Sequence, residues 1–128
     1  MSRYFLLIAA LSGFFAVALG AFAAHALKAR LDPGSLGIFQ TGVTYQMYHA
    51  LALFGVALLW SFYPARLLTW AGYCFIAGIL LFCGSLYGLA FGAPRWLGPV
   101  TPLGGTAFLL GWLFLALAAL QWKGTTPG

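Results

Sequence analysis

The stretch LLTWAGYCFIAGILLFCGSLYGLAFGA, residues 67–93, is the clearest sign of how this chain folds. It contains no charged residue and lies between Arg66 and Arg95. A transmembrane helix needs about 20 apolar residues to cross roughly 30 Å of hydrocarbon, and this stretch is longer than that. Because backbone polar groups in lipid must be satisfied within the segment itself, the stretch is predicted to be a membrane-spanning helix.

Three further apolar stretches of sufficient length occupy residues 4–24, part of 34–65, and 96–122. Of the 128 residues, 63% are hydrophobic and only 5% are charged. Soluble domains carry roughly 25% charged residues, and a soluble chain of this length could not bury so much apolar surface. We therefore predict an all-α integral membrane four-helix bundle that forms a single domain over residues 1–128, with both termini on one side.

The second helix is predicted to differ from the others in its first half. An uncharged run from Ser35 to Tyr63 would make a helix about 44 Å long, which exceeds the hydrocarbon core. The first half of this run is also polar, with Gln40, Thr41, Thr44, Tyr45, Gln46, Tyr48 and His49. We expect a polar N-terminal extension that is interfacial, steeply tilted or bent at Gly37 or Gly42, before a spanning part that starts near Tyr45.

Charge gives little information about orientation and argues against nucleic acid. The net charge of +5 comes from six scattered basic residues against the single acid Asp32, so there is no basic patch for nucleic-acid binding. The predicted side of the termini, here called the terminal side, carries Arg3, Arg66 and Lys123. The opposite side, here called the far side, carries Lys28, Arg30 and Arg95. The positive-inside count is tied, and the terminal amine favours cytoplasmic termini.

Hydrogen-bonding side chains gather toward the far side of the predicted bundle, whereas the terminal-side halves are mostly Leu, Phe, Ala and Val. Because polar groups inside a membrane are costly and face the bundle interior, this asymmetry indicates a polar site. The candidate ligand-binding residues are His25, Thr41, Tyr45, Gln46, His49, Ser85, Tyr87 and Thr101. No particular cofactor is indicated by them.

The two histidines allow several interpretations. His25 ends the first helix and His49 lies on the second, so they are expected to approach each other or to share polar partners. Two histidines from adjacent helices could ligate one metal ion or haem iron, or transfer protons. Alternatively, each imidazole forms hydrogen bonds that hold neighbouring helices in register.

Small residues are predicted to mark close helix packing, because they let backbones approach in lipid. Gly84 and Gly88 form a G-x-x-x-G pattern. Gly20 continues a stripe of small residues on the first helix, and Gly104 and Gly105 form a pair near the start of the fourth. Packing within the monomer is one use of these positions, and a homo-oligomer interface is the other.

Four motifs resemble a known family. They are Gly20-Ala21-Phe22-Ala23-Ala24-His25-Ala26-Leu27-Lys28, residues 39–53 with Tyr45-Gln46-Met47-Tyr48-His49, residues 82–89, and residues 97–112 with Thr101-Pro102-Leu103-Gly104-Gly105. Together they resemble the YgdD/YwdK-like family, a domain-of-unknown-function family of small four-helix bacterial inner-membrane proteins with eukaryotic relatives. The resemblance implies a multi-pass protein of the inner membrane, and it implies no particular activity.

The sequence therefore predicts a non-enzymatic accessory or small-ligand-binding membrane protein, whose polar residues either specify the fold or hold a ligand. Its partners are the lipid bilayer and a second copy of the chain or a larger membrane complex. A redox protein that binds haem or metal through His25 and His49 is the first alternative. An oligomeric transporter or channel is the second, because four helices alone make a narrow path.

Overall fold

In the computed structural model, which describes residues 1–123, four helices are long and apolar enough to cross a membrane. The first is α1 (Ser2–His25), extended by a short 3-10 turn at Leu27–Ala29, and the second is α2 (Pro33–Phe62). The third comprises α3 (Arg66–Gly78), a π-helical segment (Ile79–Cys83) and α4 (Gly84–Ala90). A 3-10 turn (Arg95–Leu97) precedes the fourth, α5 (Val100–Gln121). The predicted all-α membrane fold is confirmed.

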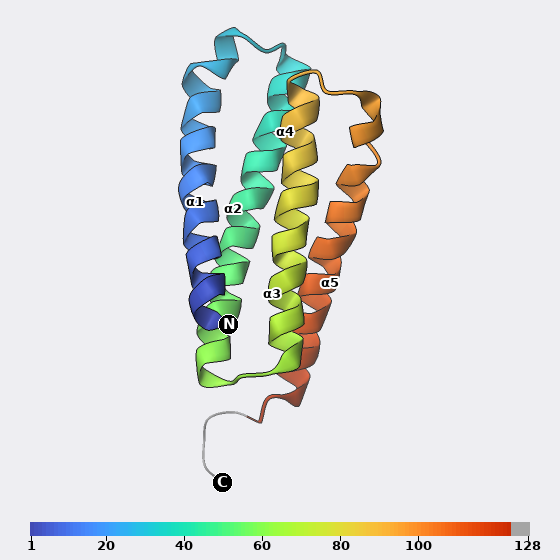
Figure 1. Ribbon diagram of the computed structural model, residues 1–128. Helices are drawn as coiled ribbons and strands as arrows, with labels where there is room; N and C mark the ends of the chain where they lie inside the picture. The colour runs from blue at the N-terminus through green and yellow to red at the C-terminus, as the bar shows by residue number, and fades with distance from the viewer. Residues whose placement is uncertain (124–128) are drawn as a thin grey trace.

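The helices run alternately up and down, and both α1 and α5 have their terminal ends at the same end of the molecule (Figure 1). The α1 helix packs mainly on α2, and α5 packs mainly on α3 and the π-helical segment. The phenol of Tyr63 at the end of α2 donates a hydrogen bond to the carbonyl of Gln121 at the end of α5. This contact fixes the end of α5 beside the loop that joins α2 to α3.

The main core lies between α2, α3 and α5 on the terminal half of the molecule. Leu53 and Val56 of α2 and Phe75 of α3 are fully buried there, and Phe5 of α1 joins them. The ring of Phe75 lies against Gly111 of α5, where an added Cβ would come within 2.6 Å of the ring. Aromatic rings that occupy the space left by glycines therefore bring α3 and α5 close together.

A second close approach involves backbone rather than side chain. A Cβ on Gly104 of α5 would overlap the backbone nitrogen of Phe82, which lies in the π-helical segment. The neighbouring Gly105 has only ordinary contact with the Phe82 ring, at 3.8 Å. Gly104 is therefore the position at which α5 crosses the third helix, and a residue without a side chain is required there.

The α2 helix begins at a well-defined cap. The Asp32 carboxylate accepts a hydrogen bond of 3.3 Å from the Ser35 backbone nitrogen, and Pro33 occupies the first helical position. Hydrogen bonds from the side chain and backbone of Ser35 lower the pKa of Asp32. The helix is then continuous to Phe62, through Gly37 and Gly42. The expected irregularity or bend before Tyr45 is wrong, while the tilt of this helix in a membrane stays a prediction.

The continuity of α2 has a physical reason. Gln46 and His49 are buried against neighbouring helices and are not exposed at a membrane surface. Their polarity therefore reflects hydrogen bonds between helices, and it requires no break in the backbone. The irregular turn lies in the third helix instead, at Ile79–Cys83.

Candidate functional site

Gln46 joins three helices by hydrogen bonds. Its Nε2 donates to the carbonyl of Ser12 on α1 over 2.8 Å, and its Oε1 accepts from the hydroxyl of Tyr87 on α4 over 2.6 Å. The Tyr87 ring lies against Gly42, where an added Cβ would come within 2.7 Å. Both ends of the Gln46 amide are thus used, and they hold α1 and α4 on opposite sides of α2.

A second polar connection joins the third and fourth helices. The hydroxyls of Ser85 and Thr101 form a short hydrogen bond, in which either oxygen can be the donor. The Ser85 hydroxyl is also within 2.9 Å of the Phe82 carbonyl, to which it donates. Because the Ser85 proton is directed to that carbonyl, the Thr101 hydroxyl donates to Ser85, and both side chains are paired.

A third connection involves His49, which lies near the middle of α2 and is only 4% exposed. Its Nδ1 is 2.8 Å from the Tyr45 carbonyl, and its Nε2 accepts a hydrogen bond of 3.1 Å from the indole nitrogen of Trp112 on α5. The carbonyl can only accept and the indole can only donate. The imidazole is therefore neutral, with its proton on Nδ1.

Aromatic rings surround this imidazole. The Phe108 ring stacks on it at a centroid distance of 3.5 Å and an interplanar angle of 9°, and Phe75 lies 5.6 Å away. The Tyr45 ring also stacks against Phe108, and its side chain is partly exposed. A hollow of about 500 Å³ opens on this face of α2 and α5, lined by Tyr45, Tyr48, His49, Leu51, Phe82, Gly105, Phe108, Leu109 and Trp112.

The two histidines do not meet, so that expectation is wrong. His25 is exposed at the end of α1, and within residues 1–123 its side chain makes no hydrogen bond. Ala23 and Leu27, on either side of His25, pack with Phe39 of α2. His49 lies roughly 15 Å further along α2 than Phe39, at 1.5 Å per residue. The antiparallel turn between α1 and α2 brings His25 beside the start of α2, far from its middle.

Thr41 also lies outside the predicted cluster. Its hydroxyl donates to the Gly37 carbonyl one turn earlier, and the side chain is exposed. Among the described residues, no group of three or more His, Cys, Asp or Glu side chains is placed to hold a metal ion. The predicted site residues thus form separate pairs between helices, centred on Gln46, Ser85 and His49.

These pairs leave little polar capacity for a ligand. Within the described part of the chain, every buried side-chain nitrogen or oxygen has a hydrogen-bond partner. A bound metal at His49 would need the Nε2 lone pair, which already accepts the proton of Trp112. The arrangement is suited to fixing helix positions in lipid, where an unpaired polar group is costly.

The predicted packing glycines divide into two groups. Gly20, Gly88 and Gly104 contact a neighbouring helix or loop closely: Gly20 faces Val43, and Gly88 faces Leu97 at 2.9 Å. Gly105 makes only ordinary contact with Phe82, and Gly84, which is exposed, has no neighbour among residues 1–123 within 4 Å of an added Cβ. Of the two glycines of the G-x-x-x-G pattern, only Gly88 therefore packs closely within the monomer. A homo-oligomer stays a prediction.

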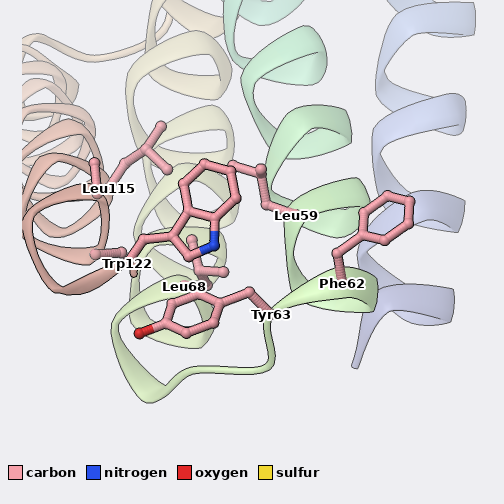
Figure 2. Close-up of a pocket in the computed structure, with 8 residues that line it drawn as sticks. Leu59, Phe62, Tyr63, Leu68, Leu115 and Trp122 are labelled. Carbon is pink, nitrogen blue, oxygen red and sulfur yellow. The ribbon is translucent and has the colours of Figure 1, made fainter. Parts of the chain in front are cut away.

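A pocket of about 480 Å³ lies at the terminal end of the bundle, where the sequence indicated no site. Figure 2 shows it between the ends of α2, α3 and α5. We call it the terminal pocket; its lining consists of Leu59, Phe62, Tyr63, Leu68, Leu115, Ala118, Ala119 and Trp122. The rings of Tyr63 and Trp122 lie next to each other, with centroids 6.4 Å apart and planes tilted by 36°, and Tyr63 is the one nearer the loop (Figure 2).

The dimensions and lining of the terminal pocket restrict what it can hold. Small-molecule pockets have volumes of about 300–1,000 Å³, and this one is within that range. From Trp122 to Leu115 it follows α5 for roughly 10 Å, at 1.5 Å per residue. That is about two-thirds of one leaflet of hydrocarbon. With an apolar lining, it can accommodate a hydrocarbon chain.

Sequence reasoning missed Trp112 and the terminal pocket. Trp112 is one of several tryptophans in apolar stretches, and only the helix register shows that it faces His49. A signal for the pocket is present in Tyr63 and Trp122, since amphipathic rings gather at the membrane–water interface. These two residues end α2 and follow α5, at the same end of the molecule.

The chain resembles bacterial membrane proteins along nearly its whole length. The family model described as "Protein of unknown function (DUF423)" matches residues 19–105. A UPF0382 membrane protein of Haemophilus influenzae is 45% identical over 96% of this chain and 98% of its own. YwdK of Bacillus subtilis, a UPF0382 membrane protein, is 42% identical over 94% and 98%. The UPF0382 inner membrane protein YgdD of Escherichia coli K12 is 41% identical over 95% and 93%.

No solved structure matches the chain. Three of the four motifs by which the sequence resembles the YgdD/YwdK-like family include Gln46 and His49, Ser85, or Thr101, and the first motif, residues 20–28, covers the end of α1 and the turn after it. The full-length similarity and the family model agree with that resemblance. The chain therefore belongs to the DUF423 family of UPF0382 membrane proteins.

Proposed function

We propose that the protein is a non-enzymatic lipid-binding protein of the inner membrane, which holds one acyl chain of a lipid in the terminal pocket. The observation that carries the proposal is the pocket itself, an apolar hollow of about 480 Å³ between α2, α3 and α5. Its length of roughly 10 Å along α5 matches a chain that enters from the headgroup level of one leaflet.

The hydrogen bonds that the buried polar residues form between helices support a pocket at the terminal end as the lipid site. Gln46, His49 and Ser85 form hydrogen bonds to α1, α4 or α5, and these bonds keep the four helices in a fixed register. Beside the pocket, the Trp60 indole donates a hydrogen bond of 3.1 Å to the Thr69 hydroxyl, which joins α2 to α3, and Tyr63 joins α2 to the end of α5. These polar pairs thus specify the fold, and the ligand occupies the terminal end of the bundle.

The proposed location in the inner membrane rests on the similarity to a protein of that membrane. YgdD of Escherichia coli is named an inner membrane protein. With three basic residues at each end of the bundle, the N-terminal amine favours an orientation with the termini in the cytoplasm. The terminal pocket then lies in the cytoplasmic leaflet.

Native mass spectrometry of the protein extracted from membranes tests the proposal. Ala119 and Ala116 are both exposed alanines of α5, but only Ala119 lines the pocket. The Ala119→Phe substitution should fill the pocket and reduce the fraction of protein that retains lipid, while Ala116→Phe should leave it unchanged. Equal retention by both variants would contradict the proposal, and circular dichroism checks that both keep their helices.

A further inference from the structure

The two cations nearest the terminal pocket have no carboxylate partner in the described part of the chain. Arg66 begins α3 directly after the loop that starts at Tyr63, and Lys123 follows Trp122. Both side chains are exposed. Tyr63 and Trp122 line the pocket, so each cation is one to three residues from its rim.

We infer that the terminal pocket selects an anionic phospholipid, whose acyl chain lies along α5 and whose phosphate headgroup is held by Arg66 and Lys123. This inference rests on the proposed function and names the class of lipid. The lining is apolar and can recognise only the hydrocarbon part of a ligand. Any selectivity among lipids must therefore come from the groups at the rim.

The charge distribution favours an anionic headgroup there. The only acidic side chain in the sequence is Asp32, and it caps α2 at the far end of the bundle. The terminal end therefore has no acidic side chain that would repel a phosphate. Arg3, at the start of α1, adds a third cation at this end. A basic residue near an anionic lipid surface strengthens binding by about fivefold.

A hydrogen bond between the Tyr63 hydroxyl and the Gln121 carbonyl joins the two chain segments that lead to the cations. It connects the end of α2 to the end of α5 over 3.4 Å, and Arg66 follows Tyr63 by three residues while Lys123 follows Gln121 by two. Arg66 follows α2 through a short loop, whereas Lys123 follows α5. The two cations thus come from neighbouring segments of different helices, so that both can reach one headgroup at this end of the bundle.

The inference is tested in nanodiscs that contain equal amounts of phosphatidylglycerol and phosphatidylcholine with the same acyl chains. Native mass spectrometry then gives the ratio of the two lipids retained. The wild type should retain phosphatidylglycerol in excess. The double variant Arg66→Gln/Lys123→Gln should lose this preference by roughly fivefold for each cation, or about 25-fold. The matched control Lys28→Gln/Arg30→Gln changes the charge equally at the far side and should keep the preference.

The outcomes separate the headgroup inference from the proposed function. Equal retention of both lipids by the wild type, with Ala119→Phe still displacing both, would overturn the headgroup assignment alone. An equal loss of preference in the far-side control would also overturn it, because general attraction to a basic protein would then explain the selectivity. Unchanged retention in Ala119→Phe would overturn the pocket as the lipid site, and with it the proposed function.

Discussion

The indole nitrogen of Trp112 donates a hydrogen bond to Nε2 of His49 across 3.1 Å, and this bond joins the middle of α5 to the middle of α2. The opposite ring nitrogen of His49 is fixed by the Tyr45 carbonyl. One imidazole therefore serves as both donor and acceptor in its neutral form. Protonation would set an N–H of His49 against the N–H of Trp112 and would break the contact.

Replacing Trp112 by Phe should destabilise the protein. The substitution keeps an aromatic ring but removes the donor, and the His49 nitrogen is left unpaired inside the bundle. Interhelical hydrogen bonds in membrane proteins contribute about 0.6–2 kcal/mol, and a decrease of this size in the free energy of unfolding is expected. Unfolding in detergent with increasing SDS measures it. The control Trp96→Phe changes an exposed ring that makes no hydrogen bond to any of residues 1–123, and an equal loss there would contradict the role of Trp112.

Haem and zinc should not bind stoichiometrically through the histidines. The Nε2 lone pair of His49 is engaged, and His25 is exposed at the end of another helix. Titration of the purified protein with haem or Zn²⁺ should give the same weak, unsaturated binding for wild type and for His49→Leu. A Soret band or a one-to-one zinc complex that disappears in His49→Leu would show that the imidazole is available as a ligand.

The adjacent glycines Gly104 and Gly105 should respond differently to alanine. A Cβ at Gly104 overlaps the Phe82 backbone, which cannot move aside as a side chain can. Gly104→Ala should therefore cost about 1–3 kcal/mol through overpacking. Gly105→Ala introduces only an ordinary contact and should be neutral or stabilising by up to about 1 kcal/mol, because Ala favours helices over Gly. Similar losses for both variants would contradict the crossing point at Gly104.

The cap of α2 should depend on pH. Hydrogen bonds from Ser35 lower the pKa of Asp32 below its ordinary value of 3.8. A lowered pKa in the folded state means that the carboxylate stabilises the fold above the unfolded value, and that this contribution is lost as the pH falls through the folded value. The Ser35 amide proton, followed by NMR, should titrate with a midpoint below 3.8 and should not titrate in Asp32→Asn. A midpoint at or above 3.8 would contradict the cap.

The number and extent of the helices could be predicted from the sequence because charges bound every apolar stretch. Arg66 begins α3 and Asp32 immediately precedes α2, so the energetic cost of placing charge in lipid marks the helix ends directly. The burial of Gln46 and His49 could also be anticipated from the cost of unpaired polar groups in lipid.

The hydrogen-bond partners of these buried side chains could not be predicted, because they depend on the rotation and register of one helix relative to another. The partner of Gln46 on α1 is the carbonyl of Ser12, and backbone acceptors are the same at every position of a helix. The pairing of His49 with Trp112 could likewise not be predicted, because nothing in the sequence distinguishes Trp112 from the other tryptophans of the apolar stretches. The terminal pocket was missed because a hollow is a property of packing: Leu59, Leu115 and Ala118 are individually ordinary membrane residues.

The most direct test of the central proposal is a structure of the protein determined in a lipid mesophase, with no detergent added after extraction. We predict continuous, rod-shaped density along Leu59, Leu115 and Ala118, with headgroup density beside Arg66 and Lys123. A terminal pocket closed by the inward-turned ring of Trp122, with lipid density confined to the outer surface of the helices, would contradict the account.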